Sequence, residues 1–356
     1  MMSMKRLCFL IFTAACATNA FSQATNCTQV LRLVRSTYEQ GRLHELPTLM
    51  EGCLHGVGDK GFTKADKREA YRYLTLAYIY LEEPEKADES MLKLLDTDHF
   101  FQINQALDPA EFIALYNKFR HEPLYWVNFK VGFNVTQPVV TKAENIGSTS
   151  GGQGSYALSV ALQFSAAWEK AIGKKIMAAP EIGLINRGYE YTNTSLAISD
   201  EDPNKYVSSL NYAVKQSWFD LNAIFYYKFK DTQELKTFVG GGPGISYLLS
   251  STNQASTVLG NGFTITGSSI DDIKSYNKLL YSFTLMAGVK KKFAEFYVTA
   301  DVRYQIGLSS AIDNANRTTP SGGYDYQIAY NDFRMNNASL NLGVSYPIFK
   351  PKKLIK

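Results

Sequence analysis

The sequence predicts an α+β chain with two parts, an N-terminal α-helical region followed by an eight-stranded antiparallel transmembrane β-barrel. Three observations lead to this fold class. Hydrophobic residues recur at helical spacing up to about residue 121, and they alternate with polar or small residues from about residue 125 onward. The connections between the alternating segments are short and long in turn. We expect a signal peptide at 1–22, a helical domain at 23–122, the barrel at 123–350 and a basic tail at 351–356.

The first segment, MMSMKRLCFLIFTAACATNAFSQ, has the order of a secretory signal peptide. Lys5 and Arg6 precede an apolar run that is too short to anchor the chain, and small residues follow before Gln23. Cys16 raises the alternative of a lipoprotein, although Thr13 stands where leucine is usual. No later run reaches about 18 apolar residues, so an exported chain held in a membrane would need a barrel.

Net charge, aromatic content and cysteine number limit the possible partners and environment of the chain. The formal charge of +4 is too small to suggest nucleic acid as a partner, and an aromatic content of 13% suits a chain with two membrane interfaces. Cys27 and Cys53 remain after the expected signal peptide, and two cysteines in an exported chain favour a disulfide. Two buried free thiols are the alternative.

The region from residue 27 to 121 has the pattern of packed helices. Thr63 is a plausible N-cap, and Pro84 suits the first turn of the next helix. A last helix is expected after Asp108 and Pro109, and Pro123 marks the boundary. We expect aromatic side chains of this region to contact a protein partner; the candidates are Tyr71, Tyr78, Phe112, Tyr116 and Phe119.

The segment from 70 to 95 resembles one tetratricopeptide repeat. The packing positions of that repeat are matched by Tyr71, Leu74, Tyr78, Ala87, Met91 and Leu94, whereas Thr75 stands where Gly or Ala is usual. The resemblance implies a stacked helix pair that offers a surface to protein partners. The alternative is any antiparallel helical hairpin with similar packing.

Beyond Leu124 the period changes to two. In SYALSVALQFSAAW, which is Ser155–Trp168, one face carries small residues, and Tyr156, Leu158, Val160, Leu162 and Phe164 lie on the other. Seven further segments alternate in this way, and the eight lie near 125–135, 155–169, 174–192, 212–230, 236–249, 278–292, 295–308 and 333–349.

The connections favour a membrane barrel over a soluble sandwich. Short ones lie near 170–173, 231–235 and 293–294, and long polar ones near 136–154, 193–211, 250–277 and 309–332. Outer-membrane barrels have short periplasmic turns and long extracellular loops. We therefore expect the large apolar residues to face outer-membrane lipid, the long loops to be extracellular, and the helical domain to lie in the periplasm.

Inside such a narrow barrel, charged side chains must pair. The candidates for ion pairs in the lumen are Lys130, Glu181, Arg187, Asp220, Lys228, Asp301 and Arg303. The three tryptophans, Trp126, Trp168 and Trp218, are expected at the membrane interfaces. The segment GGGPG at 240–244 lacks the lysine and helix of a phosphate-binding loop, so close strand packing is the better interpretation.

Residues 124–349 resemble the small OmpX-like and PorT-like outer-membrane proteins. The resemblance rests on the eight alternating segments, the loop asymmetry and the ending LNLGVSYPIF, which is similar to an outer-membrane insertion signal with Phe349 as its terminal aromatic. Pro347 and the following PKKLIK depart from that signal. A helical repeat joined to such a barrel resembles envelope proteins of gliding and type IX-secreting bacteria, which by itself implies no activity.

The sequence offers little catalytic chemistry. All four histidines, His44, His55, His99 and His121, precede the barrel, and they lack metal-ligand spacing. We expect no enzyme, no cofactor, no metal and no nucleic-acid partner. The leading hypothesis is an outer-membrane barrel that anchors a periplasmic adaptor, an accessory part of a secretion, motility or assembly complex that binds periplasmic or outer-membrane proteins. The alternatives are a surface-binding or adhesion barrel that uses its long loops, and a small-solute pore.

Overall fold

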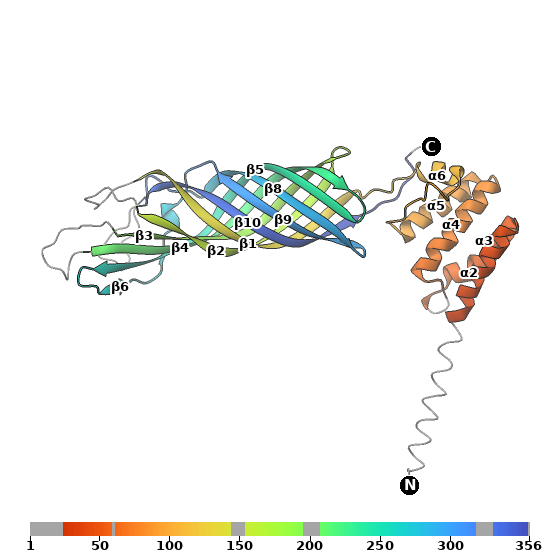
Figure 1. Ribbon diagram of the computed structural model, residues 1–356, viewed down its shortest axis with the longest axis horizontal. Helices are drawn as coiled ribbons and strands as arrows, with labels where there is room; N and C mark the ends of the chain where they lie inside the picture. Colours follow the sequence, from red (N-terminus) through yellow and green to blue (C-terminus); the bar gives the residue numbers. More distant parts are fainter. Residues whose placement is uncertain (1–23, 59–60, 144–153, 195–206, 318–329, 355–356) are drawn as a thin grey trace, which may run out of the picture. The chain divides into compact units, whose positions relative to one another are not determined.

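A computed structural model describes residues 24–58, 61–143, 154–194, 207–317 and 330–354. The expected signal peptide and parts of three long connections lie outside these residues. The chain forms two compact units, a helical unit of Met1–Pro123 with Phe349–Lys356 and a barrel unit of Leu124–Ile348 (Figure 1).

The helical unit contains five α-helices and a short 3₁₀ helix in its described part: α2 (Ala24–Glu39), η1 (Leu43–Glu45), α3 (Leu46–His55), α4 (Lys64–Tyr80), α5 (Pro84–Thr97) and α6 (Ala110–Tyr116). The Thr63 hydroxyl accepts a hydrogen bond from the backbone N–H of Asp66 at 3.2 Å, which caps α4. Pro84 occupies the first turn of α5, where its missing N–H costs no hydrogen bond. None of the described helices is long and apolar enough to cross a membrane.

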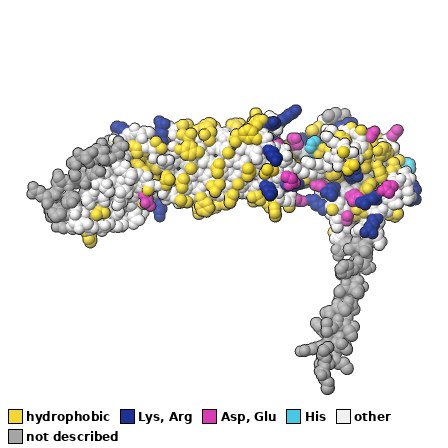
Figure 2. Space-filling model, in the orientation of Figure 1, with side chains coloured by type: hydrophobic (Ala, Val, Ile, Leu, Met, Phe, Trp, Pro, Cys, Tyr) yellow, Lys and Arg dark blue, Asp and Glu magenta, His cyan; other side chains and the backbone are white. Residues whose placement is uncertain are grey.

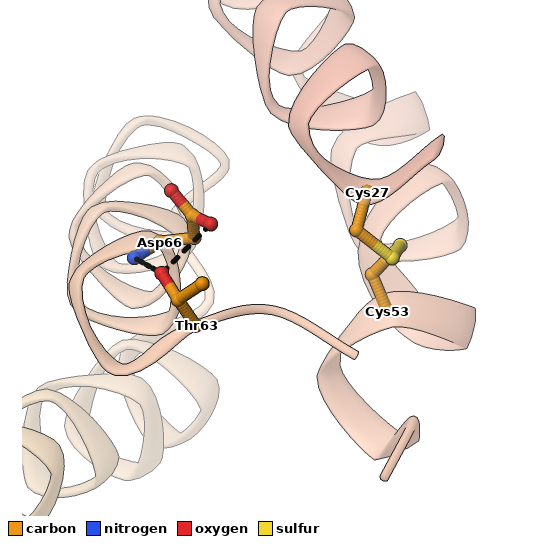
Figure 3. The surroundings of a disulfide bond; sticks show 4 residues. All are labelled: Cys27, Cys53, Thr63 and Asp66. Carbon is orange, nitrogen blue, oxygen red and sulfur yellow. Dashed lines mark hydrogen bonds between the residues drawn. A yellow bond between two sulfur atoms is a disulfide. The ribbon is translucent and has the colours of Figure 1, made fainter. Parts of the chain in front are cut away.

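A disulfide joins Cys27 of α2 to Cys53 of α3 (Figure 3). It lies in a hydrophobic core with Val34, Met50 and Leu74, all of them buried. The bond links two helices that share this core, so covalent closure supplements their packing.

The C-terminal segment is part of the helical unit and is not a free tail. Phe119 and Lys353 form a β-bridge, and the N–H of Leu354 donates to the carbonyl of Lys118 at 2.7 Å. The Lys353 ammonium pairs with Asp88 on α5. The chain therefore passes between the two units twice, at 123–124 and at 348–349.

The barrel unit confirms the expected eight long strands. They are β1 (Tyr125–Lys142), β2 (Ser155–Ala171), β3 (Ile176–Asn193), β4 (Val207–Asp231), β5 (Leu235–Leu259), β8 (Leu279–Phe293), β9 (Phe296–Gly307) and β10 (Asp332–Ile348). Their antiparallel order is β4-β3-β2-β1-β10-β9-β8-β5, and pairing of β4 with β5 closes the ring.

Side chains alternate around this ring as the sequence pattern predicts. On β1, Phe129 and Phe133 are exposed, whereas Asn128, Lys130 and Asn134 are buried. Figure 2 shows hydrophobic side chains spread over the visible outer face of the strands. The arrangement is inverted relative to a soluble protein, because the apolar side chains point outward and the polar ones fill the interior.

The longest hairpin extends beyond its expected bounds. The strands β4 and β5 pair from Asp231↔Lys236 to Val207↔Leu259, whereas β5 pairs with β8 only as far as Tyr247. The expected loop at 250–277 is therefore partly strand, and it also contains β6 (Thr264–Thr266), β7 (Ile270–Asp271) and η3 (Ile273–Ser275). Its Ser- and Thr-rich composition concealed the alternation, since both faces of this extension are polar at many positions.

Candidate functional site

The interior of the ring is the most chemically distinctive region of the barrel unit. Its central layer joins side chains from β1, β3 and β9. The Lys130 ammonium lies 3.0 Å from Asp301 and 3.4 Å from Glu181. Arg303 donates to Asp301 at 2.7 Å and to Glu181 at 2.9 Å. Two cations therefore face two carboxylates; Lys130, Glu181 and Asp301 are buried, and the Arg303 side chain is 8% exposed.

A second group lies around Arg187 of β3. Its guanidinium donates to Asp220 of β4 and to Gln305 of β9, each at 3.0 Å, and it lies 5.2 Å from the centre of the Trp218 ring. Gln305 also donates to the Ser282 hydroxyl of β8 at 2.9 Å. Side chains from opposite walls thus meet across the interior.

A third group, built around an ion pair, was missed by sequence reasoning. Lys290 of β8 pairs with Glu169 of β2, and the Tyr226 hydroxyl donates to the same carboxylate at 2.5 Å. The alternation could have identified both residues. Glu169 lies six positions after the inward Gln163 on the same strand, and Lys290 lies six positions after the inward Thr284, so both are expected on inward faces.

Very little empty space remains among these groups. A cavity lined in part by Gln163, Glu181, Asp220, Arg303 and Gln305 has a volume of about 20 Å³. That volume holds about one water molecule. Together with the three ion-pair groups, it describes a filled lumen, by which we mean the interior of the barrel unit between these residues.

The end of the ring near the long connections contains a buried aromatic cluster that the sequence analysis did not predict. Tyr189 and Tyr276 share a hydrogen bond of 2.6 Å between their hydroxyls, and the Tyr330 hydroxyl donates to Asp272 at 2.7 Å. Burial raises the pKa of the Asp272 carboxyl. The other members come from several strands and connections; they include Tyr191, Tyr212, Trp218, Leu248, Ile312 and Phe333.

Tyr156 corrects one expectation, since it does not belong to the lipid face. Its ring centre lies 4.9 Å from that of Tyr191 and 5.8 Å from that of Phe333, within the aromatic cluster. The pairing of β2 with β3 changes register between Leu158 and Gln163. Leu158, between Tyr156 and this irregularity, is 59% exposed, so the change of direction affects Tyr156 and not the whole segment. Leu158, Val160, Leu162 and Phe164 are exposed as expected.

The expected position at a membrane interface is also wrong for two of the three tryptophans. Trp126 is 7% exposed and Trp218 is 0% exposed, and both point inward. The reason is the two-residue period of a strand. Trp126 lies four positions before the inward Lys130 and Trp218 two positions before the inward Asp220, so each shares the inward face. Trp168 is 45% exposed and lies on the outer face.

Lys228 is the one lumen candidate that the structure separates from the rest. It pairs with Asp231, and Lys236 pairs with the same carboxylate. All three lie at the β4–β5 turn, where their side chains are partly exposed. The position is too close to the strand end to reach the buried groups.

The five aromatic residues expected to contact a partner do not all lie at the surface of the helical unit. Phe112, Tyr116 and Phe119 are at most 4% exposed and form the core between α4, α5 and α6, so they cannot contact a partner. Tyr71 and Tyr78 are half-buried and pack against cores of the unit. Helical spacing identifies a buried face as readily as a binding face, which explains the error at Phe112, Tyr116 and Phe119, whereas Tyr71 and Tyr78 stay predictions.

A different aromatic group, with Tyr38 and Tyr73 half-buried and Tyr80 exposed, reaches the surface of the helical unit. Tyr38 of α2 packs against Tyr73 of α4 with ring centres 5.2 Å apart, and Tyr80 is 48% exposed. Burial raises the pKa of Tyr38, the Tyr80 phenol raises it further, and the Arg72 guanidinium lowers it, which places these groups together. We call Tyr38, Arg72, Tyr73 and Tyr80 the tyrosine patch.

Phe349 does not end the last strand. The strand β10 ends at Ile348, and the Phe349 ring stacks on His99 at 5.1 Å and meets Phe100 edge-on at 5.2 Å within the helical unit. The last outward aromatic of β10 is Tyr346, which is 47% exposed. Phe349 therefore lies one residue beyond the strand, and its role in an insertion signal stays a prediction.

No group of three or more His, Cys, Asp or Glu that could hold a metal ion occurs in the described part of the chain. The four histidines lie outside the barrel strands. The arrangement of the lumen is that of paired, hydrogen-bonded charges, each positioned by strands of the ring.

Comparison with known proteins identifies the barrel. The family described as outer membrane protein beta-barrel domain matches residues 117–313. Similar solved structures include neisserial surface protein A, with 12% identity, 63% of this chain and 97% of that chain covered and a TM-score of 0.30. Ail of Yersinia pestis has 11% identity, with 62% of this chain and 97% of that chain covered and a TM-score of 0.27. OprG of Pseudomonas aeruginosa has 11% identity, with 64% of this chain and 98% of that chain covered and a TM-score of 0.37. All three scores lie below 0.5, so nothing about function follows from these likenesses. No curated protein matches the chain.

Proposed function

Because this chain belongs to the family of outer membrane protein β-barrel domains, we propose that its barrel is a non-enzymatic anchor for a helical unit that binds a protein partner. The observation that carries this proposal is the filled lumen. A cavity of about 20 Å³ among the buried ion pairs has room for about one water molecule, which argues against a wide solute path among these residues. The barrel's contribution is then to hold the rest of the chain at the membrane.

The topology supports an orientation. Eight strands place the start of β1 and the end of β10 at one end of the ring, together with the three short turns. In outer-membrane barrels the short turns are periplasmic. Both connections to the helical unit leave from this end, so we place the helical unit in the periplasm and the long connections outside the cell.

The tyrosine patch is the surface we assign to the partner. Tyr and Arg are the residue types most enriched at the energetic centre of protein interfaces. Arg72 lies in the patch already oriented, since it pairs with Asp108 at 2.5 Å. A partner that covered the exposed Tyr80 ring would bury apolar surface beside a fixed cation. Such a role fits an accessory component of a secretion, motility or assembly complex.

Site-specific photo-crosslinking in intact cells tests the proposal. A crosslinker at position 80 should capture a protein of defined mass, whereas one at Val57, which is 88% exposed and lies outside the patch, should not. Capture at both positions alike, or at neither, would contradict the assignment of the patch.

A second function is favoured by one specific observation, the extended β4–β5 hairpin. Phe263 and Ile265 near its tip are 64% and 45% exposed. A surface-binding barrel would use these apolar side chains for contact outside the cell. Phe263→Ser with Ile265→Ser should then abolish attachment to a target surface, while crosslinking from position 80 stays unchanged. The third possibility, a solute pore, is tested by conductance in planar bilayers, where the filled lumen should give no channels.

A further inference from the structure

The outer face of the barrel unit contains a groove in its apolar band. It has a volume of about 620 Å³, within the range of ligand-binding clefts, and crosses β2, β3, β4 and β5. Short side chains form its floor, namely Ala166, Pro180, Ala223 and Pro243. Larger ones border it, namely Val127, Trp168, Ile182, Leu221 and Ile245. We call it the β2–β5 groove.

The groove coincides with two interruptions in the hydrogen-bond ladders. Pairing of β2 with β3 passes from Ala167↔Glu181 directly to Lys170↔Ala178, and Pro180 lies in this gap. Pairing of β4 with β5 passes from Asn222↔Gly244 to Phe225↔Gly241, with Pro243 in the gap. A proline has no N–H to donate to the neighbouring strand. The concavity is therefore built into the backbone and does not depend on side-chain positions alone.

Beyond the groove, the end of β2 and the turn that follows it have the chemistry of a lipid headgroup site. Along the outward face of β2, Ala166 is followed by Trp168 and then by Lys170, at alternate positions. Trp168 is 45% exposed, and tryptophan prefers the membrane interface, where its ring meets hydrocarbon and its N–H meets water. Lys170 and Lys174 are exposed, and neither has an acidic partner among the described residues.

We propose that the β2–β5 groove binds one anionic phospholipid, with an acyl chain along Ala166, Pro180 and Ala223 and the phosphate at Lys170 and Lys174. The groove is continuous with the lipid-facing surface, so hydrocarbon reaches it directly. The two lysines supply a charge complementary to the phosphate. Trp168 lies between the apolar and the charged parts, as the boundary between acyl chain and headgroup requires.

A second groove provides a matched control. It measures about 640 Å³ and is lined by residues of β5, β8 and β9, among them Leu285, Ala287 and Val302. Ladder pairing is continuous across it, and no tryptophan lines it. The two grooves have similar volumes, so a difference in lipid retention between them would not come from volume.

Native mass spectrometry of the purified full chain tests the proposal with phosphatidylglycerol and phosphatidylcholine. The wild type should retain phosphatidylglycerol preferentially, and Lys170→Gln or Lys174→Gln should each reduce retention about fivefold, which corresponds to about 1 kcal/mol per lysine. Ala223→Leu fills the groove and should reduce retention of the bound lipid, as should Ala166→Leu, a second variant in case the first does not fold. Ala287→Leu in the control groove should leave retention unchanged.

Three outcomes would overturn the proposal. They are equal retention of the two lipids by the wild type, unchanged retention in both groove-filling variants, and a loss in Ala287→Leu as large as that in Ala223→Leu. Folding of each variant is checked by the shift in gel mobility between unheated and heated samples. The proposal involves only the barrel unit, so failure to find a partner for the helical unit would not affect it.

Discussion

Replacing Glu181 with Gln tests whether the filled lumen is held by its ion pairs. Glu181 accepts hydrogen bonds from Arg303 and lies 3.4 Å from Lys130, and its side chain is only 4% exposed. Gln keeps the shape of the side chain and removes its charge. The two cations are then left with Asp301 as their nearest carboxylate.

The expected cost follows from burial. Removing one partner of a buried, hydrogen-bonded charge group destabilises a protein by about 3–5 kcal/mol, because an uncompensated charge remains in the interior. With a urea dependence of about 3 kcal/mol per M, the unfolding midpoint should fall by about 1–1.7 M. The slope of the free energy of unfolding against urea concentration should change little, since the same surface is exposed on unfolding.

Asp231→Asn is the matched control. Asp231 also pairs with two lysines, Lys228 and Lys236, but its side chain is 31% exposed at the β4–β5 turn. An exposed pair contributes about 0–1 kcal/mol, so this variant should unfold almost as the wild type does. Urea unfolding in lipid vesicles, followed by tryptophan fluorescence, measures both variants. Equal shifts in the two variants would refute the claim that the lumen depends on buried charge pairing.

Three further predictions concern other parts of the chain. Cys27→Ser with Cys53→Ser should destabilise the helical unit by about 3.5 kcal/mol, from the entropy of a loop with a separation of 26 residues, measured by thermal unfolding. Gly242→Ala should block barrel folding, measured by gel mobility, because its Cβ would lie 1.9 Å from the Ala223 carbonyl oxygen, whereas Gly173→Ala, with open space around it, should fold. Burial raises the pKa of Tyr116 to about 12, so the helical unit should lose stability as the pH rises from about 10 to about 12, and Tyr116→Phe should lose less over that range.

The fold could be predicted because a membrane barrel is specified by a simple pattern. Alternation over eight segments identified every long strand, since each side chain must face either lipid or lumen. Lys130, Glu181, Asp301 and Arg303 could be assigned to the lumen for the same reason. Their partners could not, because register between distant strands determines which charges meet.

The errors at two tryptophans and in the helical unit have two physical sources. Trp126 and Trp218 were assigned by residue preference where their own parity pointed inward, so packing in the lumen prevailed over the preference of tryptophan for interfaces. Phe112 and Phe119 were assigned to a binding face although a short helix needs its apolar side for the core. The tyrosine patch combines α2 with α4, and no sequence spacing reveals a pair of helices that meet in space.

The most direct test of the central claim is affinity purification of the full chain from detergent-solubilised membranes, compared with a Tyr73→Ala, Tyr80→Ala variant. The variant keeps the barrel, the disulfide and the docked C-terminal segment. If the helical unit is the binding part of an anchored adaptor, the protein partners of the wild type should be lost from the variant and retained by Phe263→Ser with Ile265→Ser. Partners that survive the tyrosine changes and disappear with Phe263 and Ile265 would contradict the account and assign binding to the extended hairpin.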